Sequence, residues 1–175
     1  MSDTFITVIA IMLTAVLMLV LPVMTMADRF DATTQANIES ITSEFVEDVR
    51  TTGKLTRERH NKFLENLSAT GYTYDVNMEF KIQDENPGKK TTQSTRDKIG
   101  ENVSYSVYTS QIEKVLEEDA SHTYTLKQGD MISVTVRNTD LTLAQQMKDF
   151  MYKVVGNDNY TVVTTQGGLV QSNSK

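Results

Sequence analysis

The chain has 175 residues, of which 39% are hydrophobic, and its formal net charge is −6. A chain of this length accommodates an anchor segment and one domain of about 120–150 residues with its own core. The acidic balance argues against a nucleic-acid binder that works through overall positive charge. Because the chain contains no Cys, disulfides, thiolate metal sites and a Cys nucleophile are excluded.

The first element is an apolar stretch from Phe5 to Met26 that contains no charged residue. As a helix it would rise about 33 Å, which is enough to cross the hydrocarbon core of a bilayer. We therefore predict a transmembrane anchor over residues 1–27, and Pro22 lies near its outer end, where it kinks a helix without dismantling it. The positions expected to contact lipid or neighbouring helices are Phe5, Ile9, Leu13, Leu17, Leu21 and Pro22.

A cleaved signal peptide is the alternative interpretation of the same stretch. Ala27 supplies a small residue before Asp28, where cleavage would fall. However, the residues before Phe5 include no Lys or Arg, and the apolar run exceeds the ~7–15 residues usual in signal peptides, so a retained anchor is favoured. Neither flank is rich in Lys or Arg, so charge does not set the orientation. With so short an N-terminal tail, the simplest topology exports the C-terminal domain.

Residues 28–52 continue the helix without an intervening Gly or Pro. Their apolar side chains recur at helical spacing and form one stripe, which predicts an amphipathic stalk that packs on the rest of the chain. Gly53 is a suitable C-terminal stop. The stalk residues expected to pack against the head are Phe30, Ile38, Ile41, Phe45 and Val49.

Residues 53–165 are expected to form an α+β head, followed by a flexible tail over 166–175. A short helix capped by Thr56 and ended by Gly71 comes first. Residues 72–82 then alternate apolar and polar side chains strictly, which predicts a strand with one buried face. A second helix is expected to have Thr109 or Ser110 as its N-cap.

The C-terminal part of the head is expected to contain a hairpin, a helix and a last strand. The hairpin would join residues 122–127 and 131–137 around Gln128-Gly129-Asp130. The helix would begin at Asp140 or Thr142 and end at Gly156, and the strand would cover residues 160–165.

The resulting order after residue 71 is β-α-β-β-α-β, which matches a ferredoxin-like split unit. Another strand within residues 84–108 is the alternative. Both interpretations give an antiparallel-rich sheet packed on helices, with the long N-terminal helix against it.

Residues 83–104 form a long polar segment whose basic side chains contrast with the acidic chain. We interpret this segment as a solvated loop; the alternative is a contact with an acidic neighbouring subunit. The basic side chains are Lys89, Lys90, Arg96 and Lys98.

No motif of a known catalytic chemistry is present: there is no Gly-Lys phosphate loop, no Gly-x-Ser-x-Gly elbow and no zinc-type pairing. The two histidines are isolated from each other; His60 is expected on a solvated helix face and His122 at the start of a strand. We therefore expect a protein that is not an enzyme, with no catalytic residue, no cofactor and no metal.

An apolar helix with Pro22 near its outer end, an uninterrupted amphipathic extension and a C-terminal α+β head together resemble type IV pilin-like subunits, including TadE-like pseudopilins. The stretch Leu19-Val20-Leu21-Pro22 is similar to the corresponding part of a pilin N-terminal helix. The chain departs from the family pattern in lacking a Glu within the apolar run, where Asp3 is the nearest acid, and a basic leader ending in Gly.

The resemblance implies a structural subunit of an extracellular filament or secretion pseudopilus, at the cell surface. Its partners would be membrane lipid before assembly, the assembly machinery, and copies of itself or related subunits, with no role for nucleic acid. The alternative function is a monomeric single-pass membrane protein that displays a small extracytoplasmic binding domain.

Overall fold

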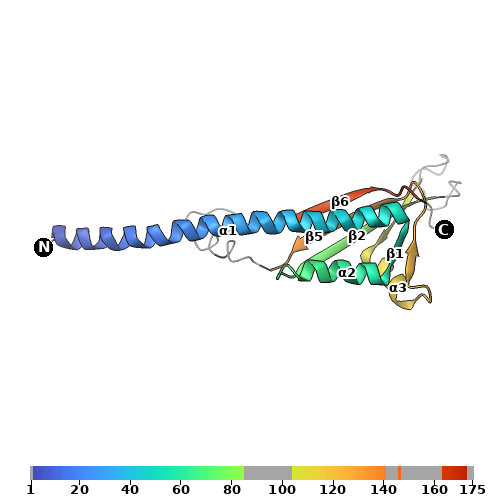
Figure 1. The fold of residues 1–175 in the computed structure, drawn as a ribbon, viewed down its shortest axis with the longest axis horizontal. Helices are drawn as coiled ribbons and strands as arrows, with labels where there is room; N and C mark the ends of the chain where they lie inside the picture. Colours follow the sequence, from blue (N-terminus) through green and yellow to red (C-terminus); the bar gives the residue numbers. More distant parts are fainter. Residues whose placement is uncertain (1, 85–103, 141–145, 147–162, 173–175) are drawn as a thin grey trace, which may run out of the picture.

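One helix, α1 (Ser2–Thr52), forms the long axis of the protein. The computed structural model describes residues 2–84, 104–140, 146 and 163–172. The N-terminal half of α1 projects from the head, and its C-terminal half packs on the other elements (Figure 1). The helix is unbroken at Pro22 and ends where Gly53 adopts a positive φ of 64°, which glycine tolerates without steric cost.

The head is built on a four-stranded sheet with the order β3-β2-β5-β6, and each adjacent pair is antiparallel. The strands are β2 (Tyr74–Gln83), β3 (Ser104–Tyr108), β5 (Met131–Asn138) and β6 (Val163–Leu169). In the central pair, Phe80 faces Ile132 and Met78 faces Val134. All four side chains are buried, because their period-two spacing places them on the same face of the sheet.

Two short helices and a small second sheet complete the head. Helix α2 (Arg57–Ser68) and helix α3 (Thr109–Glu118) pack with α1 against the apolar face of the sheet, and β1 (Lys54–Thr56) pairs with β4 (Thr123–Thr125). The expected N-cap of α2 is confirmed: the Thr56 hydroxyl accepts a hydrogen bond from the backbone N–H of Arg59. The core consists of Ile38, Phe45, Val46, Val49, Leu55, Phe63, Leu67, Met78, Phe80, Ile112, Leu116, Leu126, Ile132, Val134, Val136 and Val170.

The prediction of an α+β chain with a long N-terminal helix and an antiparallel sheet is confirmed. The ferredoxin-like order is not confirmed, because β3 pairs with β2 and β4 lies outside the four-stranded sheet. The strand allowed for within residues 84–108 is present as β3.

The expected hairpin between residues 122–127 and 131–137 is wrong. Gly129, with a φ of 97°, and the bond from Asp130 N–H to the Lys127 carbonyl do form a turn. The strands on its two sides join different sheets, however, since β4 pairs with β1 and β5 lies between β2 and β6. Local turn chemistry predicted the reversal correctly, and tertiary pairing decided the partners.

Two boundaries also differ from expectation. Helix α3 has Tyr108 as its N-cap, and Thr109 instead binds β2 by accepting from the Met78 N–H at 2.7 Å. Residues 166–169, expected in a flexible tail, belong to β6, and Val170 is buried. Of the helix expected to begin at Asp140 or Thr142 and to end at Gly156, the structure describes Asp140, which is not helical, and Gln146, which is; the other positions lie outside the described residues.

Candidate functional site

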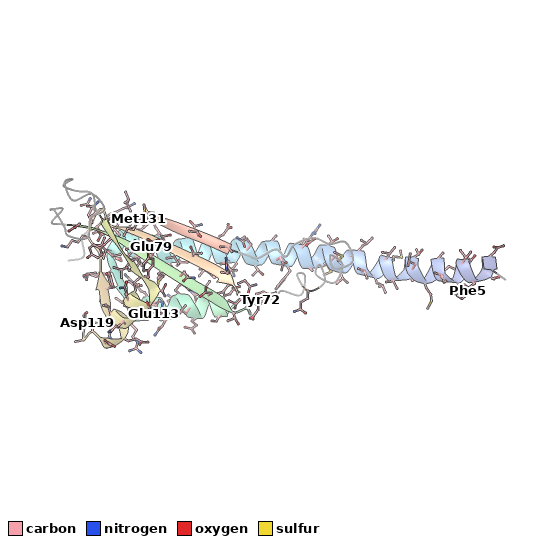
Figure 2. All side chains as sticks on the ribbon, turned by 180° about the vertical axis from the view of Figure 1, so that it is seen from behind. Phe5, Tyr72, Glu79, Glu113, Asp119 and Met131 are labelled. Atoms are coloured by element: carbon pink, nitrogen blue, oxygen red, sulfur yellow. The ribbon has the colours of Figure 1, made fainter. Side chains whose placement is uncertain are left out.

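The projecting half of α1 is the largest exposed apolar surface among the described residues. Figure 2 shows Phe5 near the free end of this helix, far from the head. Most large apolar side chains between Phe5 and Met26 are 45–77% exposed and lie on all sides of the helix, whereas Val20 and Met24 are partly buried. They include the predicted contact positions Phe5, Ile9, Leu13, Leu17 and Leu21, and Pro22 is exposed among them.

Within the described residues, α1 is the one helix that is long and apolar enough to cross a membrane, and its most apolar window has a mean hydropathy of 2.8 with none of it buried. A core helix of a soluble protein can be equally long and apolar, but the other elements of the protein cover it. The segment therefore differs from a core helix, and it requires an apolar environment that the described chain does not supply.

The polar side chains of this segment are satisfied within the helix. The hydroxyl of Thr7 donates to the Asp3 carbonyl and that of Thr14 to the Ala10 carbonyl, each at 2.7 Å. The hydroxyl of Thr25 donates to the Leu21 carbonyl at 3.0 Å. Because none of these hydroxyls depends on water, they can enter an apolar environment at little cost.

The C-terminal half of α1 is packed tightly against the head. Ile38, Phe45 and Val49 are buried, and Ile41 is partly buried against the same core. The buried face is wider than the predicted stripe, because Val46 and Thr42 are also buried. Sequence reasoning missed Thr42 because threonine is usually solvated; here its hydroxyl donates to the Ile38 carbonyl at 2.7 Å.

Polar contacts fix α1 along β6, which runs beside it (Figure 1). Near the start of β6, the side-chain amide of Gln35 donates to the Thr164 hydroxyl at 2.9 Å. Near its end, the Arg50 guanidinium donates to the Leu169 carbonyl at 2.9 Å and forms an ion pair with Glu47 at 2.7 Å. The helix is thus held at both ends of one strand, so the projecting half is coupled to the head without a flexible joint.

The fifth predicted stalk residue, Phe30, is different from the other four. Its side chain is 57% exposed. It contacts the head through an edge-to-face interaction with the ring of Tyr72, with 6.5 Å between the ring centroids. Phe30 therefore lies at the edge of the described part of the head.

A groove of about 900 Å³ lies between α1 and α2. It is lined by Phe45 and Phe63, whose rings stack with their centroids 4.1 Å apart. An ion pair between Arg59 and Asp48, 3.0 Å long, lies beside them. The lining mixes acidic, basic and apolar side chains, so the groove has no single charge preference.

The described residues include no group of three or more His, Asp or Glu side chains placed to hold a metal ion. The expectation for His60 is wrong: it is only 7% exposed and points into the core, and burial lowers the pKa of its imidazole. Its neighbours in sequence are polar, but this position is buried, and the Glu113 carboxylate of α3 acts on its imidazole in the opposite direction by raising the pKa. His122 precedes β4, and its Nδ1 lies 2.9 Å from the Leu116 carbonyl.

Asp130 is a structural carboxylate. It is buried, and its two oxygens accept from the backbone N–H groups of Gln83 and Lys127 at 2.9 and 2.8 Å. These bonds tie the end of β2 to the turn before β5. The predicted contact residues Lys89, Lys90, Arg96 and Lys98 lie outside the described residues.

Comparison of the chain with protein-family models, with curated proteins and with solved structures finds no match.

Proposed function

We propose that this chain is a pilin-like structural subunit, held in a membrane by the projecting half of α1 before it assembles into an extracellular filament or pseudopilus. In the assembled state, contacts among the apolar helices of many copies would replace their contacts with lipid. The heads would form the outer surface. The proposal follows the resemblance in the N-terminal 52 residues and the α+β class of the head.

The single observation that carries the proposal is the continuity of α1. One unbroken helix carries exposed apolar side chains around its first half and, in its second half, buries one face against β5, β6 and α2. Covering a large apolar side chain contributes about 1.5–3 kcal/mol, so the exposed segment as a whole represents on the order of tens of kcal/mol. Lipid or copies of the same helix can supply that cover.

Rigid coupling supports a filament subunit over a simple tether. A tethered domain needs only a flexible linker between anchor and head. Here Gln35 and Arg50 bind β6 at two points of the same helix, and the core closes around Val49. A force or displacement applied to the projecting half is therefore transmitted to the head, as a filament subunit under tension requires.

A charge placed in the projecting half tests the burial of this segment. Ala15→Lys puts an ammonium in the middle of the apolar stretch, which costs about 2.5–3.5 kcal/mol at the centre of a spanning helix. The variant should lose both membrane association and assembly, measured by fractionation and by electron microscopy of sheared surface material. Asn37→Lys, on the exposed side of the stalk, is the matched control and should retain both.

Normal anchoring and assembly of the Ala15→Lys variant would show that residues 5–26 are not buried in either state. The alternative function, a monomeric membrane protein with a binding domain, gives a separate outcome. In that case the Ala15→Lys variant loses anchoring, but the unmodified chain with an intact N-terminus stays a monomer and never forms fibres.

A further inference from the structure

Among the described residues, the end of the head nearest to the projecting half of α1 is the turn between α2 and β2. Figure 2 shows Tyr72 at this end. The ring of Tyr72 meets that of Phe30 at an interplanar angle of 62°, with 6.5 Å between the centroids. Phe30 is 57% exposed despite this contact, so an aromatic surface remains open at the junction of head and stalk.

The position of this aromatic pair along α1 follows from helix geometry. Phe30 lies four residues beyond Met26, the last residue of the uncharged stretch, which corresponds to a rise of about 6 Å. The hydrocarbon core of a bilayer is about 30 Å thick, and the headgroup layers extend the total to about 40–45 Å. If the uncharged stretch fills the hydrocarbon core, Phe30 and Tyr72 fall within the headgroup layer on the side of the head.

The turn that carries Tyr72 is fixed in place by hydrogen bonds. Gly71 has a φ of 86°, and its N–H donates to the Ser68 carbonyl at 3.0 Å. The hydroxyls of Thr70 and Tyr74 lie 2.6 Å apart. On the other side of Tyr72, the N–H of Thr73 donates to Asp140 at 3.0 Å. The distance of Tyr72 from the apolar stretch is therefore set by the fold.

The chemistry of the pair suits the boundary between lipid and water. Tyrosine has an apolar ring and a polar hydroxyl, and such side chains concentrate at membrane interfaces. Partial burial and the nearby Asp31 carboxylate raise the pKa of Tyr72, so its hydroxyl stays neutral at physiological pH. The charged residues Asp28, Arg29 and Asp31 lie at the same level of α1 and carry no excess of positive charge toward anionic lipid.

We propose that Phe30 and Tyr72 form a contact with the headgroup layer of a zwitterionic bilayer, so that the head rests on the membrane at its α2–β2 turn. This inference rests on the membrane anchoring proposed above and adds the surface by which the head meets lipid. The contact defines the axial position of the subunit before assembly, and both aromatic rings must leave the interface when the subunit is extracted.

The absence of Trp from the chain provides a clean test. Single Tyr72→Trp and Phe30→Trp variants of the full chain are reconstituted in phosphatidylcholine vesicles. Their fluorescence is quenched in turn by lipids brominated near the headgroup, by lipids brominated deep in the acyl chain, and by aqueous acrylamide. Leu13→Trp reports the depth of the anchor, and Tyr105→Trp, on an exposed side chain of β3, reports the solvated head.

The lipid brominated near the headgroup should quench the two junction variants, Tyr72→Trp and Phe30→Trp, most strongly. Their emission maxima should lie at shorter wavelength than that of the Tyr105→Trp variant. The deep lipid should quench the Leu13→Trp variant. If Leu13→Trp is quenched by lipid while both junction variants behave like Tyr105→Trp, the interface contact is overturned and the anchoring stands. If Leu13→Trp is open to acrylamide and insensitive to both lipids, the anchoring and the contact fail together. The Phe30→Trp variant keeps the test valid if Tyr72→Trp disturbs the turn.

Discussion

The contact between Arg50 and Gly168 gives the most quantitative prediction, because each residue constrains the other. A Cβ atom at position 168 would lie 2.6 Å from Nε and 2.7 Å from Cζ of Arg50. These distances are too short for non-bonded atoms, so an alanine at 168 must displace the guanidinium. The displacement breaks the 2.9 Å hydrogen bond to the Leu169 carbonyl and the ion pair with Glu47.

The magnitude follows from these two contacts. A hydrogen bond from a charged donor is worth about 1.5–3 kcal/mol, and a partly exposed ion pair about 0.2–1 kcal/mol. Since the Arg50 side chain is about a quarter exposed, we take the lower part of the range and expect Arg50→Ala to cost about 2 kcal/mol. Gly168→Ala should cost a similar amount. In the Arg50→Ala background, however, the space is free, and Gly168→Ala should be neutral or slightly stabilising.

The assay is equilibrium urea unfolding of the full chain in detergent, followed by tyrosine fluorescence. All seven tyrosines lie after residue 71, so the signal reports the head and not the micelle-bound part of α1. Arg57→Ala is the matched control: Arg57 is exposed on α2, and its loss should change the free energy of unfolding by less than about 0.5 kcal/mol. Additive effects of Arg50→Ala and Gly168→Ala, within about 0.5 kcal/mol, would refute the coupling.

Three further predictions use the same unfolding measurement. Gly167→Ala should destabilise more than Gly168→Ala, because its Cβ would lie 2.8 Å from the backbone oxygen of Ile132, which cannot move aside as a guanidinium can; equal costs would contradict this. Ile38→Ala should lower the free energy of unfolding by about 2–5 kcal/mol. Leu13→Ala, in the exposed half of the same helix, should leave the free energy of unfolding of the head unchanged. An equal loss in both variants would show that Leu13 packs on the head. Burial lowers the pKa of His60 below its ordinary value of 6.5, so below pH 6.5 the unfolded chain takes up the proton first and stability falls as pH falls. His60→Gln should flatten this fall between pH 6.5 and about 5, above the range where most carboxylates titrate; an unchanged pH profile would mean that His60 is not buried in solution.

The local sequence was sufficient to predict a helix or strand wherever one strong pattern specified that element. The uncharged stretch and the amphipathic stripe predicted one long helix, and Gly53 ended it with a positive φ. The alternation over residues 72–82 predicted β2, and the Thr56 hydroxyl predicted the start of α2. In each case the periodicity or a single capping bond determines the local conformation.

The sequence did not decide which strands pair or which polar residues are buried. The predicted last strand ended at residue 165 and residues 166–169 were expected in a tail, yet β6 continues to Leu169 because α1 and β5 both contact it. Glycines at 167 and 168 are required there by close approach to Ile132 and Arg50, which lie far away in sequence. His60 is also buried, although the helix face that carries it appears polar in isolation.

The sequence by itself determined that α1 is a long helix, that its first half is apolar on all sides and that an α+β domain follows. These properties depend on composition and on periodicities within one segment. The tertiary structure decided how the helix is joined to the head: the contacts along β6, the turn that carries Tyr72 beside Phe30, and the division of the strands between two sheets. These depend on residues distant in sequence, whose meeting no local pattern encodes.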